Sequence, residues 1–183
     1  MNEARGQKSD VRSQNEEVNH NRPGCYFCIL TSDFCISPRM LRLTQTDYEA
    51  LRRHGEETYP HECCGVLLGR VDDNGARIVT STARCGNTRT DSPQNRYNID
   101  PRELVRIQRE GRERSEDIVG FYHSHPDHPA RWSQTDLAEA HWFGCSYVIT
   151  SVEKGKAVLT NSFELGGSDE GDKQLIDEKV EVA

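Results

Sequence analysis

The sequence predicts an α/β domain in which a mixed, mostly antiparallel β-sheet is flanked by helices. Short apolar runs with strand character alternate with segments of helical periodicity, which is typical of a sheet that carries helices on its faces. Two turn signals, Asp73-Asn74-Gly75 and Glu153-Lys154-Gly155-Lys156, each separate two such runs and predict hairpins. The strand expected at the centre of the sheet, Ile118–Tyr122, leads into a pair of histidines.

Composition limits the class of the protein. The chain has 183 residues, enough for one domain with a full core or a smaller domain plus tails. A formal net charge of −7 argues against a nucleic-acid partner, which would require a basic face. No apolar run approaches the roughly 20 residues of a membrane span. Seven scattered cysteines, an odd number, are interpreted mainly as reduced thiols of a cytoplasmic protein.

The first part of the chain, residues 1–39, is predicted to be a disordered extension. Residues 1–22 are polar and mixed in charge, without periodicity. A C-x-x-C pair and one further cysteine follow, but no second pair completes a four-cysteine zinc site, so their role stays open. These three residues are Cys25, Cys28 and Cys35. Because the structured pattern begins at Met40, we interpret that residue as a candidate native start in place of Met1.

One helix and four strands are predicted between Met40 and Ile99. Thr46 and Glu49 form a capping-box signature, which predicts a helix to about Thr58. The polar loop 84–96 could shape a cleft. The strands are expected at Leu41–Leu43, Val66–Leu68, Ile78–Thr82 and Tyr97–Ile99.

Two further helices and a second hairpin are predicted after residue 100. Asp100 and Pro101 suit a helix start, and a second helix is expected from Ser133 to Trp142. The hairpin strands are Tyr147–Val152 and Ala157–Phe163. We place a catalytic domain at residues 40–165, and an acidic linker with a last strand at residues 166–183. The prediction of that strand is based on Ile176, Val180 and Val182, whose even spacing would place all three side chains on one face.

The candidate site begins with two histidines. His123 and His125 lie two positions apart at the end of a strand, so their side chains can face one way while Ser124 faces the other. Ser133 stands at an N-cap position, and Asp136 lies in the first turn on the same side. Two imidazoles and one carboxylate that meet across a loop are typical of a three-ligand zinc site with one position open for water.

Other residues near this pattern are weaker candidates. Asp127 and His128 are rival ligands in the same loop, whose direction the flanking prolines leave undefined. The dipeptide His61-Glu62 does not complete the H-E-x-x-H motif, because its fifth position is Gly65. Glu62 is either a solvated residue between a helix and a strand or a base beside the metal. The two cysteines after it, Cys63 and Cys64, are interpreted as small core residues.

The ordered set of Glu62, His123-Ser124-His125, a seven-residue spacer, Ser133 and Asp136 resembles the pattern of the JAMM metalloproteases. These proteins are the catalytic form of the MPN domain. The segment H-S-H-P-D-H-P-A-R-W-S-Q-T-D is similar to the compact prokaryotic branch, whose members often work beside ubiquitin-like sulfur carriers of the ThiS/MoaD kind. The resemblance spans roughly Met40 to Val182 and implies the MPN (JAMM) fold.

The resemblance also implies a site chemistry. Zinc would be held by His123, His125 and Asp136, Glu62 would serve as the base, and Ser133 would donate a hydrogen bond to the oxyanion. The substrate would be a ubiquitin-like sulfur carrier, cut at the amide bond after its Gly-Gly tail. We favour processing of the carrier's carboxy terminus or release of a cysteine from it.

Three alternatives differ in class. A deubiquitinase-like isopeptidase would carry long insertions for gripping ubiquitin, and the loops here are compact. A non-catalytic MPN scaffold would lack part of the ligand set, which is complete here. A zinc nucleoside deaminase requires H-x-E followed by P-C-x-x-C, and this sequence has neither in place.

Overall fold

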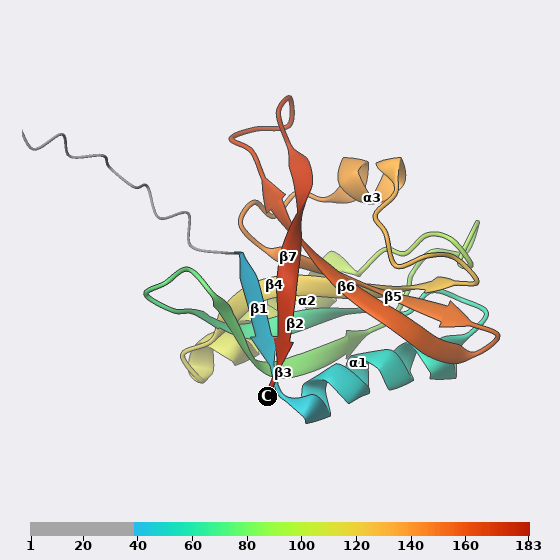
Figure 1. The fold of residues 1–183 in the computed structure, drawn as a ribbon, viewed down its shortest axis with the longest axis horizontal. Coiled ribbons are helices and arrows are strands. Elements are labelled where there is room, and N and C mark those ends of the chain that lie inside the picture. Colours follow the sequence, from blue (N-terminus) through green and yellow to red (C-terminus); the bar gives the residue numbers. More distant parts are fainter. Residues whose placement is uncertain (1–38) are drawn as a thin grey trace, which may run out of the picture. The chain divides into compact units, whose positions relative to one another are not determined.

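The computed structural model describes residues 39–183, which hold seven strands and three helices (Figure 1). The predicted extension and its three cysteines lie outside the described residues, apart from Arg39. The strands are β1 (Met40–Leu43), β2 (Cys64–Val71), β3 (Arg77–Cys85), β4 (Asp117–Pro126), β5 (Ser146–Glu153), β6 (Lys156–Gly166) and β7 (Gln174–Val182). The helices are α1 (Gln45–Thr58), α2 (Pro101–Glu113) and α3 (Gln134–Glu139).

The strands form one mixed sheet that closes into a barrel in the order β1-β3-β2-β4-β5-β6-β7, with β7 returning to β1. The pairs β2–β3, β2–β4, β5–β6 and β6–β7 are antiparallel, and β1–β3, β1–β7 and β4–β5 are parallel. The mixed, mostly antiparallel sheet is confirmed. Its closure was not predicted, because the pattern of a single strand does not say which distant strand it will pair with.

Helices α1 and α2 cover different parts of this sheet. Helix α1 packs against β3 to β6, and α2 packs against β2 and β4 (Figure 1). Leu51 of α1 joins the core cluster that includes Leu67, whereas Ile107 of α2 joins the cluster that includes Val66 and Leu68. Because β2 is buried on both faces, its apolar run is continuous rather than alternating. No helix in residues 39–183 has both the length and the apolar character needed to cross a membrane.

Several local predictions are confirmed. Gly75 turns the first hairpin with φ +81°, and Lys154 and Gly155 turn the second with φ +50° and +79°. The Asp100 side chain caps α2 by accepting from the N–H of Arg102, and Pro101 is its first residue. A strand is present at the end of the chain, where β7 pairs with both β6 and β1.

Two helix boundaries differ from the prediction. Helix α1 is capped by Thr44, not Thr46, because the Thr44 side chain reaches the N–H of Asp47. Helix α3 ends at Glu139 instead of Trp142. Ala140 is extended (φ −80°, ψ 121°) and 1% exposed, so the chain leaves the helix to bury this side chain.

The predicted strand Tyr97–Ile99 is wrong. These residues form no ladder, although the N–H of Thr88 bonds to the carbonyl of Asn98 across the loop. The Tyr97 ring instead stacks on His123, with centroids 4.7 Å apart and 28° between the planes. Aromatic residues favour strands, but here the packing of Tyr97 against the candidate site decides its position.

Candidate active site

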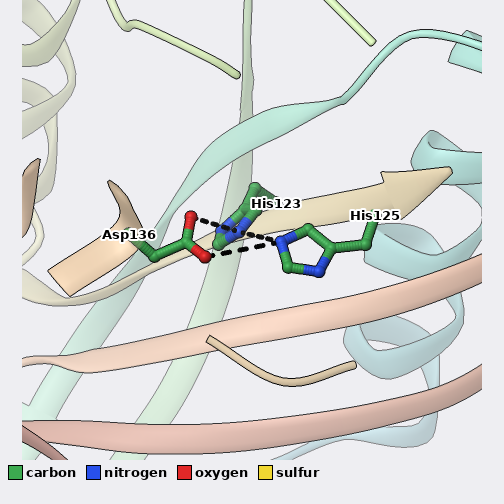
Figure 2. Close-up of side chains that lie close together, drawn as sticks. All are labelled: His123, His125 and Asp136. Carbon is green, nitrogen blue, oxygen red and sulfur yellow. Dashed lines mark hydrogen bonds and ion pairs between the residues drawn. The ribbon is translucent and has the colours of Figure 1, made fainter. Parts of the chain in front are cut away.

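Three potential metal ligands converge where β4 meets the start of α3 (Figure 2). The Nε2 atoms of His123 and His125 lie 3.1 Å apart. Asp136 Oδ1 lies 3.3 Å from His123 Nε2, and Asp136 Oδ2 lies 3.6 Å from His125 Nε2. The i, i+2 spacing on β4 therefore brings both imidazoles to one side, as expected.

The spacing of these atoms fits zinc. Ligands about 2.0–2.1 Å from a tetrahedral zinc lie about 3.3 Å from one another. The three measured separations, 3.1, 3.3 and 3.6 Å, bracket that value. Two imidazole nitrogens and a carboxylate are also a donor set that zinc prefers, and three protein ligands leave one position open. The residues present therefore fit the metal that the sequence pattern implies.

The two histidines are held by different contacts. His125 Nδ1 lies 2.9 Å from the carbonyl oxygen of Pro129, which can only accept, so Nδ1 carries the proton and donates. The lone pair of His125 Nε2 then faces the other two ligands, the orientation common in metal sites. The ring of His123 is fixed by Tyr97, which stacks on it.

Ser133 and Asp136 form a reciprocal capping box at the start of α3. The N–H of Ser133 donates to Asp136 Oδ2 at 2.6 Å, and the N–H of Asp136 donates to Ser133 Oγ at 3.2 Å. The Ser133 hydroxyl accepts in this cap, so its own proton stays available for another partner. The cap fixes both a potential ligand and a potential donor.

Burial and charge shift the ionisation of the group. Burial lowers the pKa of His123, although Asp136 acts against this. Burial also opposes protonation of His125, but its bonds to Asp136 and to the Pro129 carbonyl outweigh that effect and raise its pKa. Burial would raise the pKa of Asp136, yet the two histidines hold it well below its usual range. Asp136 is therefore a carboxylate, as a metal ligand must be.

Glu62 is buried, so its interpretation as a solvated residue is wrong. It is 5% exposed, and burial raises its pKa to about 8, with His125 lowering and Asp136 raising it. Its N–H donates to the carbonyl of Pro93 at 2.8 Å. Glu62 lines a cavity of about 400 Å³. The nine lining residues are Glu62, Asn95, Arg96, His125, His128, Pro129, Arg131, Ser133 and Thr135.

The two rival ligands do not join the group. Asp127 accepts hydrogen bonds from Tyr59 Oη at 2.7 Å and from the N–H of Lys154 at 2.8 Å, which direct it to the second hairpin. His128 lines the cavity but is not part of the ligand cluster found among the described residues.

Sequence reasoning missed the part played by loop 84–96 and the residues just after it. Asn87 Nδ2 donates to the carbonyl of Glu62 at 3.3 Å, and Asn95 and Arg96 line the cavity. The polar composition suggested a cleft but not these contacts. Asn87 carried a usable signal, because asparagine in loops commonly bonds to nearby backbone.

The chain is similar to known proteins in sequence and in fold. A curated desampylase of Haloferax volcanii is 41% identical over 92 residues, which cover 50% of this chain and 63% of that protein. A solution structure from Desulfitobacterium hafniense has 31% identity and a TM-score of 0.67, covering 79% of this chain and 93% of that one. Another from Salinibacter ruber has 37% identity and a TM-score of 0.57, covering 75% and 89%.

The family comparison covers most of the described domain. Residues 44–165 match the family described as prokaryotic homologs of the JAB domain. This range contains Glu62, both histidines, Ser133 and Asp136. The chain therefore belongs to the prokaryotic JAB-domain family.

Proposed function

We propose that this protein is a zinc-dependent hydrolase that cuts the amide bond after the Gly-Gly tail of a ubiquitin-like protein. The observation that carries the proposal is the convergence of His123, His125 and Asp136 at tetrahedral ligand spacing, beside a cavity that also contains Glu62. A carboxylate and an open metal position in one cavity are the parts that metal-assisted amide hydrolysis requires.

The substrate class rests on relatives. One relative is named a desampylase. We extend the hydrolysis that this name denotes to this chain, with a ubiquitin-like protein as the bound substrate. A sulfur carrier of the ThiS/MoaD kind remains the specific substrate that we propose, cut to expose its Gly-Gly end or to release a cysteine.

In this proposal each residue has one task. His123, His125 and Asp136 would hold zinc, which when bound would polarise a carbonyl and lower the pKa of a water molecule to about 7. Glu62 takes the proton of the attacking water and delivers it to the leaving nitrogen. The Ser133 hydroxyl donates to the oxygen on which negative charge develops.

The test combines metal analysis with turnover. The purified full chain should contain one zinc per molecule and should release the residue placed after the Gly-Gly end of a ubiquitin-like carrier. Glu62→Gln should keep zinc, because Glu62 is not among the three ligands, yet lose nearly all turnover. Glu113→Gln, an exposed glutamate on α2, is the matched control and should behave as wild type.

Two results would contradict the proposal. Normal turnover by Glu62→Gln would remove that residue from the mechanism. A folded chain that binds no zinc and cuts no carrier would be a docking module instead of an enzyme.

A further inference from the structure

Two arginines line the cavity beside Glu62. Arg96 lies in the loop between β3 and α2, and Arg131 lies in the loop between β4 and α3. Both residues are exposed. Within residues 39–183 neither guanidinium forms an ion pair, whereas the nearby Arg89 pairs with Asp91 at 3.0 Å and with Glu139 at 3.5 Å. Among the described residues, the cavity wall therefore holds two guanidinium groups that form no ion pair, although Arg96 is near enough to Asp91 to help lower the pKa of that carboxyl.

The backbone that carries Arg96 is tied to Glu62 through one side chain. Asn87 Nδ2 donates to the carbonyl of Glu62 at 3.3 Å and to that of Arg96 at 3.0 Å. Asn87 Oδ1 accepts from the N–H groups of Arg89 at 3.0 Å and Asn98 at 3.2 Å. These bonds link the backbone of Arg96 to the backbone of the proposed base.

The backbone that carries Arg131 is tied to a potential metal ligand. The N–H of Arg131 donates to the carbonyl of Pro129 at 2.8 Å. The same carbonyl accepts from His125 Nδ1 at 2.9 Å. Both arginines are thus presented by segments that are hydrogen-bonded to residues of the candidate site.

The charge pattern indicates an anionic ligand group. The chain carries a net charge of −7, so a cavity with two arginines that form no ion pair among the described residues differs in charge from the chain as a whole. A guanidinium matches a carboxylate in shape and can donate two parallel hydrogen bonds to it. Amide hydrolysis places the leaving group next to the base that protonates its nitrogen. A carboxylate on that leaving group would lie within the same cavity.

We propose that Arg96 and Arg131 bind a free α-carboxylate on the leaving group, an inference that rests on the proposed function. The preferred substrates are then ubiquitin-like proteins that end in a short extension after Gly-Gly, such as a single amino acid. A conjugate to an internal lysine lacks this feature, because the lysine's own carboxyl is part of a peptide bond. In the reaction one water is consumed: its hydroxyl joins the glycine carbonyl carbon, the C–N bond breaks, and its proton goes to the released amine.

The test compares two substrates that differ in one charge. A ubiquitin-like carrier ending in Gly-Gly-Ala is prepared as the free acid and as the carboxamide. Wild type should cut the acid with a kcat/KM about 10- to 100-fold higher, the range expected for hydrogen bonds to a charged group. In the double variant Arg96→Gln/Arg131→Gln this ratio should fall to about one. Arg109→Gln, an exposed arginine on α2 without an ion pair among the described residues, should keep the wild-type ratio.

The outcomes separate the inference from the function beneath it. Equal cleavage of both substrates by wild type would overturn the inference and leave the hydrolase intact. A preference for the acid that survives in the double variant would overturn the assignment to these arginines. If zinc-loaded wild type cuts neither substrate, the proposed function itself fails, and the inference fails with it.

Discussion

The hydroxyl of Ser124 accepts a hydrogen bond of 2.9 Å from the backbone N–H of Cys63, and the N–H of Ser124 donates to the Cys63 carbonyl at 3.3 Å. Ser124 stands between the two histidines, and Cys63 directly follows Glu62. This pair therefore connects the strand that carries two potential metal ligands to the segment that carries the proposed base.

Replacing Ser124 with alanine should harm both stability and turnover. The Cys63 N–H would be left buried without a partner, which costs about 1–3 kcal/mol of unfolding free energy. Turnover should fall while zinc is retained, because the link between Glu62 and the histidines loosens. Denaturant unfolding, zinc content and kcat measure the three effects. Ser146→Ala is the matched control: that hydroxyl is buried without a hydrogen-bond partner among the described residues, so its loss should cost little.

Gly65→Ala should be strongly destabilising. A Cβ at this position would lie 2.2 Å from the Tyr122 ring and 2.5 Å from the carbonyl oxygen of Ala83. One of these contacts is backbone within the sheet, so relief requires the strands to move, at a cost of about 3 kcal/mol or more. Gly86→Ala meets nothing within 4 Å and should shift the unfolding midpoint little. Equal midpoints for the two variants would show that the sheet accommodates the methyl group.

Ser133→Ala should separate a structural role from a catalytic one. Loss of the N-cap should cost about 1 kcal/mol of stability. Loss of an oxyanion donor should lower kcat by about 10²- to 10³-fold. Ser133→Thr keeps both the cap and the hydroxyl, so it should restore most of each. A Ser133→Ala enzyme with wild-type kcat would restrict this residue to capping α3.

His54 should make stability depend on pH. It is 7% exposed, and its Nδ1 lies 2.9 Å from Tyr122 Oη. Burial, with Arg84 nearby and Glu57 opposing, lowers its pKa to about 4. The unfolded chain, with an ordinary pKa near 6.5, binds this proton more readily. The contribution of His54 to the free energy of unfolding is therefore largest above about pH 6.5 and decreases as the pH drops toward 4. The decrease between pH 7 and pH 5 is about 2 kcal/mol.

The His54→Gln variant provides the comparison. Glutamine can hydrogen-bond to Tyr122 but does not titrate. Between pH 7 and pH 5, the unfolding free energy of this variant should change by about 2 kcal/mol less than that of the wild type. Parallel curves for the variant and the wild type would assign the pH dependence to other groups.

The sequence by itself determined most of the helices and strands, and the order of the potential ligands. Both hairpins follow from turn residues whose backbone conformation is local, and the β4 histidines share a side because strand geometry has a period of two. The capping box at Ser133 and Asp136 is likewise contained within four residues. Such features depend on neighbours in the chain, so the sequence shows them directly.

Only the tertiary structure decided what surrounds those ligands. Closure of the barrel depends on the pairing of β7 with β1. The paired residues Leu43 and Val182 are more than 130 positions apart in the chain. Burial of Glu62, the stacking of Tyr97 on His123, and the Asn87 bonds likewise join segments that are distant in sequence. These contacts arise when separate elements pack together, and the free energy that fixes them comes from that packing instead of any local preference.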